Sequence, residues 1–207
     1  MALILGLAAA CALIYLPLAS RPASVPRTAF KTTSVALLAC GSALAGLPWL
    51  LTLALALCAI GDALLAQDNE QSFMAGVGAF AAGHLAYVAL FLGHPNSDTA
   101  QILQSPLALA ALAALGLVMA VSLAPRAGAL RGPVLAYIPV ILAMGVAVLS
   151  LPNATAQLAA LAFVASDTVL ASEKFLLPDD HPARRVTPWL VWPLYWGAQA
   201  GFVLAFA

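Results

Sequence analysis

The feature that most constrains this chain is a succession of apolar segments, each close to twenty residues long. A helix needs about 20 mainly apolar residues to cross the roughly 30 Å hydrocarbon core of a bilayer. Of the 207 residues, 64% are hydrophobic and only 8% are charged, and a water-soluble domain of this size carries far more charge. The sequence therefore predicts an all-α, polytopic transmembrane bundle that forms one domain over residues 1–207.

About eight such segments fit the chain. We expect helices over residues 2–19, 32–47, 48–66, 73–93, 105–123, 133–151, 155–176 and 188–206. Pro48, Pro133 and Pro188 each open a segment, and proline suits the first turn of a helix but cannot continue one. The second and third helices meet at Gly46-Leu47-Pro48, so we expect a very tight turn there. The first 20 residues contain no basic residue, so we expect them to stay as a span and not to be cleaved as a leader.

Every lysine and arginine follows or ends an odd-numbered span, or begins the next one. In chain order these eight cations are Arg21, Arg27, Lys31, Arg126, Arg131, Lys174, Arg184 and Arg185. Cytoplasmic loops of membrane proteins carry an excess of Lys and Arg. The pattern predicts cytoplasmic odd-numbered loops, both termini on the non-cytoplasmic side, and a multi-pass location in the cell (inner) membrane. Residues 67–71 carry no cation and are placed in the cytoplasm by alternation, and the net charge of zero gives no indication of nucleic-acid binding.

Asp62, His84 and Asp167 are ionisable residues that lie at least about one turn inside predicted spans. A charged group at the centre of a membrane helix costs on the order of 2.5–3.5 kcal/mol on insertion scales, so such residues usually have a function. Asp62 lies about one turn from the cytoplasmic end of the third span, Asp167 about two turns from that end of the seventh, and His84 near the middle of the fourth. We expect all three in the inner half of the bundle. A water-reaching interfacial role for Asp62 and a structural role for His84 stay open.

Helical spacing adds further polar residues to this set. Tyr87 follows His84 by three residues and so shares its helix face. Lys174 follows Asp167 by two turns, nearer the cytoplasm. The other candidates, in the sixth and eighth spans, are Tyr137, Tyr195 and Gln199.

The remaining residue classes indicate no second site. The three cysteines, Cys11, Cys40 and Cys58, fall in predicted spans and are interpreted as small packing residues. One histidine and two aspartates from three helices are weak evidence for a metal site, and we expect neither a metal nor a cofactor. We expect the four tryptophans to form an interfacial belt; they are Trp49, Trp189, Trp192 and Trp196.

The ordered set of polar residues resembles the YhhN family, which includes the lysoplasmalogenases. The similarity starts near residue 30 and continues to the C-terminus. The matching residues are Phe30-Lys31, Gly61-Asp62, Gly78-Ala79-Phe80, Gly83-His84, Tyr87, Phe163, Ser166-Asp167, Lys174-Phe175, Tyr195 and Gln199.

This resemblance implies a membrane hydrolase acting on an ether bond. The substrate would be a lysoplasmalogen, a lysophospholipid within the membrane, and the products a fatty aldehyde and a glycerophospho-alcohol. Asp62 and Asp167 would serve as acid and base, with the roles unassigned, and His84 or Tyr87 would orient water or shuttle a proton. The residues expected to contact the substrate are Lys31, Lys174, Tyr137, Tyr195 and Gln199, and the basic inner edge, with Arg184 and Arg185, would lie near the lipid phosphate.

Two other functions stay open. A small proton- or cation-coupled transporter would use the same aspartates to bind its ion. Residues 61–66 and 166–171 are faintly alike, which would suit a parallel internal repeat, although chance in a chain rich in Leu and Ala is the simpler explanation. The third hypothesis is a lipid-binding or assembly protein without catalysis, in which the aspartates contribute to stability.

Overall fold

The computed structural model describes residues 1–67 and 69–207; Asp68, which belongs to the predicted third loop, lies outside the described residues. Eight long helices and one short one make up the described chain, with no strand, so the all-α bundle of about eight helices is confirmed. The helices are α1 (Ala2–Tyr15), α2 (Val25–Leu44), α3 (Trp49–Leu65), α4 (Glu70–Gly93), α5 (Ala100–Leu103), α6 (Pro106–Leu123), α7 (Arg131–Ala147), α8 (Ala154–Leu176) and α9 (Thr187–Phe206). Short 3₁₀ turns follow α1, precede and follow α7, and precede α9.

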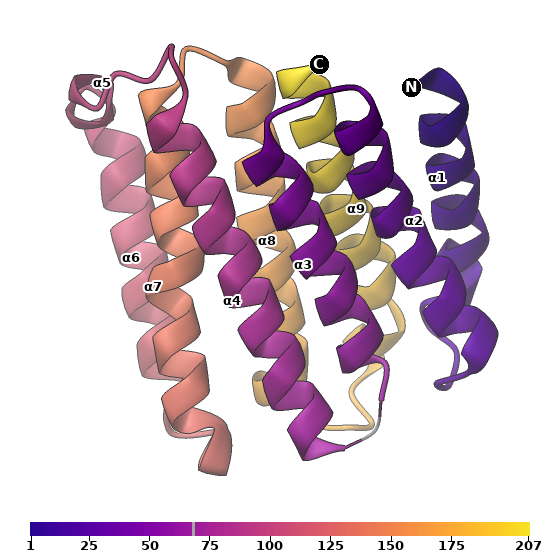
Figure 1. The fold of residues 1–207 in the computed structure, drawn as a ribbon. Coiled ribbons are helices and arrows are strands. Elements are labelled where there is room, and N and C mark those ends of the chain that lie inside the picture. The colour runs from indigo at the N-terminus through magenta and orange to yellow at the C-terminus, as the bar shows by residue number, and fades with distance from the viewer. Residues whose placement is uncertain (68) are drawn as a thin grey trace.

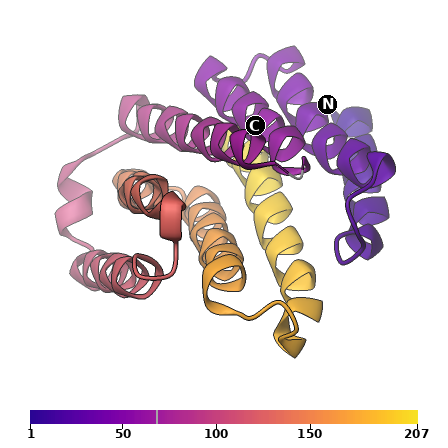
Figure 2. The ribbon, with the colours of Figure 1, turned by 90° about the horizontal axis from the view of Figure 1, so that it is seen from below.

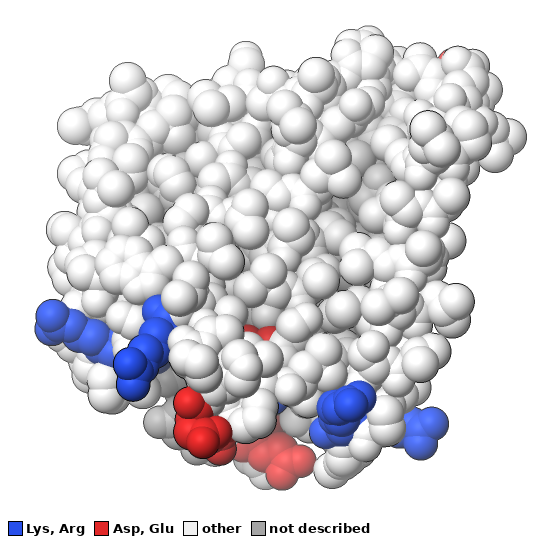
Figure 3. Space-filling model, turned by 180° about the vertical axis from the view of Figure 1, so that it is seen from behind, with Lys and Arg blue, Asp and Glu red and all other residues white. Residues whose placement is uncertain are grey.

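The long helices run up and down, and both termini lie at the same end of the bundle (Figure 1). The cations lie at the other end, where the loops after α1, α6 and α8 gather (Figure 3). Viewed from that end, α8 lies between α7 and α9 (Figure 2), and it also contacts α6. The bundle therefore has one charged end and one nearly uncharged end.

The surface between the two ends is apolar, as a membrane protein requires. Among the described residues, four helical stretches are long and apolar enough to cross a bilayer: α4, α6, Gly128–Ser150 and α8. Ala2–Leu18 and α3 are shorter apolar helices. Large apolar side chains such as Leu3, Leu107 and Leu117 point outward, and most of the face in Figure 3 carries no charge. Residues of this kind on the outside of a bundle suit contact with lipid.

The second helix begins earlier than the hydropathy pattern predicts. It starts at Val25 and not at residue 32, with Pro26 in its first turn. Arg27 and Lys31 are thus helical, and their expected place in a loop is wrong. The apolar pattern missed these two turns because they carry Arg27 and Lys31, which line a cavity, and hydropathy alone cannot separate such a helix face from a loop.

One tryptophan also departs from its predicted place. Trp192 is buried, with 4% of its surface exposed, so its assignment to an interfacial belt is wrong. Its indole N–H donates to the carbonyl of Ala12 at 3.0 Å, and its ring packs against Tyr15 with ring centres 4.3 Å apart. Trp192 therefore joins α9 to α1, whereas Trp49 is exposed, as a belt position requires.

The tight turn between α2 and α3 is built on one glycine. Gly46 has a φ of +68°, its N–H donates to the carbonyl of Ala43, and the N–H of Leu47 donates to that of Ser42. This pair of bonds is the Schellman ending of a helix, which places its left-handed residue just after the C-cap. The predicted tight turn at Gly46-Leu47-Pro48 is confirmed.

Replacing Gly46 with alanine is expected to lower the free energy of unfolding by about 1 kcal/mol, because a side chain disfavours the left-handed conformation. An unfolding titration in mixed detergent micelles measures it. Gly78→Ala is the matched control, since Gly78 lies inside α4 and a Cβ there meets nothing within 4 Å; it should be neutral or stabilising. Equal effects of the two substitutions would contradict the assignment.

Candidate functional site

Asp62 lies in a buried cluster near the charged end of the bundle. It occupies the last turn of α3 and is 1% exposed. Lys31 of α2 places its Nζ 2.8 Å from one carboxylate oxygen, and the hydroxyl of Tyr195 on α9 donates to the other at 2.7 Å. The Lys31 ammonium also lies over the Tyr195 ring, 5.9 Å from its centre. Both oxygens of Asp62 therefore have a partner, and one of these partners is a cation.

Asp167 has a different set of partners. It lies about two and a half turns before the end of α8. The hydroxyl of Tyr137 on α7 donates to its Oδ2 at 2.6 Å, and the Nε2 of His84 on α4 lies 3.9 Å from that oxygen. Among the described residues, no lysine or arginine lies within ion-pair distance of Asp167.

The contacts of His84 indicate which of its two ring nitrogens carries a hydrogen. Its Nδ1 lies 2.6 Å from the carbonyl oxygen of Phe80, and because a carbonyl only accepts, Nδ1 carries a hydrogen. The buried Nε2, which faces Asp167, makes no hydrogen bond to any described residue. His84 therefore presents an open ring nitrogen toward the carboxyl group of Asp167.

Two phenylalanines connect the clusters around the two aspartates. The ring of Phe163 lies 4.5 Å from that of His84 and 5.3 Å from that of Tyr195, measured between centres. Phe80 accepts the His84 hydrogen bond through its carbonyl, and its ring packs edge-on against Tyr195 at 5.8 Å. The polar residues of the site are therefore held by an aromatic layer that keeps their rotamers fixed.

Both aspartates line one cavity of about 450 Å³. Its polar lining includes Lys31, Asp62, Tyr137, Asp167, Lys174 and Tyr195. Much of the rest is apolar and comes from α6, α7 and α8. Three helices of the described chain thus contribute an apolar wall to a cavity that is also lined by the acidic residues Asp62, Asp167 and Glu173.

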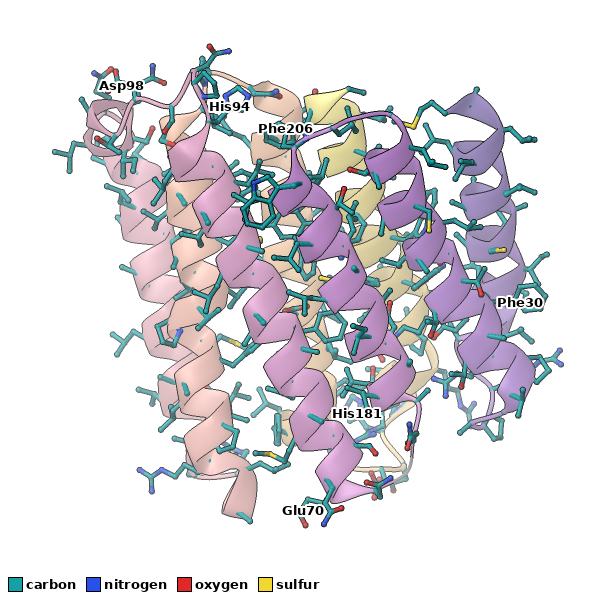
Figure 4. All side chains as sticks on the ribbon, viewed as in Figure 1. Phe30, Glu70, His94, Asp98, His181 and Phe206 are labelled. Atoms are coloured by element: carbon teal, nitrogen blue, oxygen red, sulfur yellow. The ribbon has the colours of Figure 1, made fainter. Side chains whose placement is uncertain are left out.

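The site lies toward the charged end of the bundle. Glu70 and His181 mark that end in Figure 4, while His94, Asp98 and Phe206 mark the other. Lys174, which lies in the last turn of α8, has its Nζ 4.1 Å from the centre of the Phe73 ring. Arg184 also lines the cavity and pairs with Asp179 at 3.3 Å. Cations therefore surround the side of the cavity nearest the loops.

Three of the predicted site residues, Tyr87, Gln199 and His84, lie behind the cavity lining. Tyr87 and Gln199 are fully buried and hydrogen-bond to each other, the hydroxyl donating to the amide oxygen. Neither lines the cavity, and neither does His84. The structure thus brings Asp62, Asp167, Lys31, Lys174, Tyr137 and Tyr195 to the cavity and leaves His84, Tyr87 and Gln199 one layer away.

Sequence reasoning missed two residues of the site. Arg27 lines the cavity but was counted only as a loop cation, and Phe163, although part of the family pattern, had no assigned role. The sequence feature that could have assigned Arg27 to the site is its position four residues before Lys31, which places both residues on the same helix face. Among the described residues, no group of three or more His, Cys, Asp or Glu side chains is placed to hold a metal ion.

Fold and site together define a polytopic helical membrane protein in which two aspartates, Asp62 (buried) and Asp167 (17% exposed), line one cavity. The YhhN family model matches residues 26–206, which is most of the chain, so the protein belongs to the YhhN family. This confirms the resemblance. No curated protein and no solved structure matched the chain.

Proposed function

We propose that this protein is a lysoplasmalogenase, which hydrolyses the vinyl ether bond of a lysoplasmalogen by carboxylate acid–base catalysis. The observation that carries the proposal is that Asp62 and Asp167, which have unlike partners, line one largely apolar cavity. Vinyl ether hydrolysis needs a proton donor and a negative charge near the same bond. Two carboxyl groups in different environments can supply these two roles.

The partners of each aspartate support separate roles. Asp62 forms an ion pair with Lys31 at 2.8 Å and accepts a hydrogen bond from Tyr195, contacts that favour the carboxylate. Asp167 has no cation partner among the described residues and lies in contact with Tyr137. We therefore assign the proton to Asp167 and the negative charge to Asp62.

The reaction follows from this assignment. Asp167 transfers its proton to the alkene carbon next to the ether carbon, and the ether carbon becomes an oxocarbenium ion that the Asp62 carboxylate stabilises. Water adds to this carbon and returns a proton to Asp167. The hemiacetal then loses its hydroxyl proton, and the glycerol oxygen leaves with a proton. One water is consumed, and one aldehyde and one alcohol are formed.

Tyr137 and His84 would act through Asp167. When Asp167 has given up its proton, the Tyr137 hydroxyl at 2.6 Å stabilises the carboxylate. The open Nε2 of His84 lies 3.9 Å from Asp167, so a small movement of either side chain would allow it to exchange a proton with that carboxyl group. Both are positioning residues in this scheme, since neither needs to touch the reacting bond.

The charges also support a membrane orientation. The cations lie in or next to the loops after α1, α6 and α8, and the cytoplasmic side of a membrane protein is the one rich in Lys and Arg. We propose that this end faces the cytoplasm, with both termini on the other side of the cell (inner) membrane. The lysophospholipid would then enter from the inner leaflet, with its phosphate near the basic residues.

The direct test is aldehyde release by the purified protein in detergent, with lysoplasmenyl-ethanolamine as substrate. In D₂O the aldehyde should carry one deuterium on the carbon next to the carbonyl, because that carbon is protonated in the first step. The saturated ether analogue, which has no alkene, should not be cleaved. Absence of aldehyde release would contradict the function, and substrate-driven proton flux in proteoliposomes would instead favour the transporter.

A further inference from the structure

The cavity has two unlike sides. On the side of α1 and α2, it is lined by Tyr15, Ala19, Arg27 and Lys31. On the side of α6 and α7, apart from Tyr137 the lining is aliphatic, and its inner part consists of Leu115, Gly116, Met119, Ile138, Ile141 and Leu142. These six residues are called the aliphatic arm below.

The aliphatic arm extends deep into the bundle. Leu142 lies about three turns, or roughly 16 Å, from the start of α7 at Arg131. Leu115 lies about two turns from the end of α6 at Leu123. No described residue of the arm carries a charge or a hydrogen-bonding side chain, so the arm suits a hydrocarbon chain and gives no partner to a polar group.

Arg27 lies at the opposite side with unused hydrogen-bonding capacity. One guanidinium nitrogen donates to the carbonyl of Ala19 at 3.3 Å. Its buried Nε has no hydrogen-bond partner among the described residues, and no carboxylate described lies within ion-pair distance of the guanidinium. A guanidinium in this condition suits a phosphate, which accepts two parallel N–H bonds.

We propose that a single-chain lipid lies across the cavity, with its phosphate at Arg27 and its hydrocarbon chain in the aliphatic arm. This rests on the proposed function. In a lysoplasmalogen the vinyl ether joins the chain to the glycerophosphate, so the bond would lie between the two sides. Asp62 and Asp167 line the same cavity, and this orientation presents the ether end of the chain to them.

A photoreactive lipid tests the orientation. The probe is a saturated-ether lysophosphatidylethanolamine with a diazirine near the end of its chain, added to the intact protein in detergent. After irradiation, mass spectrometry should find the label mainly on peptides of α6 and α7 that contain the aliphatic arm. Label mainly on α1 or α2, or no label that excess unlabelled saturated-ether lysolipid displaces, would overturn the proposal. The probe has no alkene, so this result does not depend on hydrolysis, and a failed aldehyde assay with correct labelling would reject only the function.

Two pairs of variants sharpen the test. Met119→Gln places an amide in the aliphatic arm and should reduce displaceable labelling several-fold. Its control is Val118→Gln, which adds an amide on the outer face of α6, where Val118 is exposed. The control should leave labelling unchanged. Arg27→Gln should weaken probe binding several-fold, and Arg126→Gln, at an exposed hydrogen bond to Ser122, should not. Equal effects within either pair would overturn the corresponding half of the proposal.

Discussion

Aldehyde release is expected to fall by about 10²–10⁴-fold when Asp167 is replaced by asparagine, the range typical of losing a general acid. Asparagine keeps the shape of the side chain, and its amide oxygen can still accept the hydrogen bond from Tyr137. The variant should therefore fold normally and fail only to deliver a proton to the alkene. Initial rates with lysoplasmenyl-ethanolamine, measured beside the thermal unfolding temperature, separate the two effects.

The matched control is Asp98→Asn. Asp98 lies at the opposite end of the bundle (Figure 4) and accepts a hydrogen bond from the N–H of Ala100, a contact that asparagine can also make. Its aldehyde release should equal that of the wild type. If Asp167→Asn retained wild-type activity, Asp167 could not be the acid. If it instead lost stability without losing specific activity, Asp167 would have a structural role and not a catalytic one.

The second large effect is on stability. Replacing Lys31 with methionine is expected to lower the free energy of unfolding by about 3 kcal/mol, because it leaves the carboxylate of Asp62 buried without its cation. The value lies at the low end of the range for breaking a buried pair because Lys31 is 23% exposed and water can partly replace it. Unfolding in mixed detergent micelles measures the loss.

The double variant Lys31→Met/Asp62→Asn provides the control. Removing both charges removes the buried carboxylate, so most of the stability lost in Lys31→Met should return. A coupling energy near zero between the two positions would show that the ion pair contributes nothing to stability. The double variant should still be inactive, since it lacks the negative charge at Asp62.

The sequence predicted the helices well because two independent signals agreed. The lengths of the apolar segments predicted eight spans, and the cations occurred only at every second loop. One span too many or too few would have broken that alternation. The errors arose where a helix surface faces a polar cavity or a protein neighbour instead of lipid. The start of α2 was misplaced because its first turns carry Arg27 and Lys31, and Trp192 was misplaced because its partner Ala12 is 180 residues away along the chain.

The candidate site was predictable in part for the same reason. The cost of an acid in a span singled out Asp62 and Asp167, and both line the cavity. Helical spacing shows which residues share one helix face, but it does not give the rotation of one helix against the next. This is why Gln199, one turn after Tyr195, bonds to Tyr87 behind the cavity while Tyr195 reaches Asp62.

The order of the helices bears on how the chain enters the bilayer. Asp62 finds its cation on α2, the helix immediately before its own, joined through the turn at Gly46. Asp167 finds the hydroxyl of Tyr137 on α7, again the preceding helix. Each acidic group can thus be neutralised or hydrogen-bonded within a single helical hairpin during synthesis, before α9 is made. Each hairpin therefore brings one partner for its acidic group into the bilayer, and Asp62 gains its second partner, Tyr195, when α9 packs against the bundle.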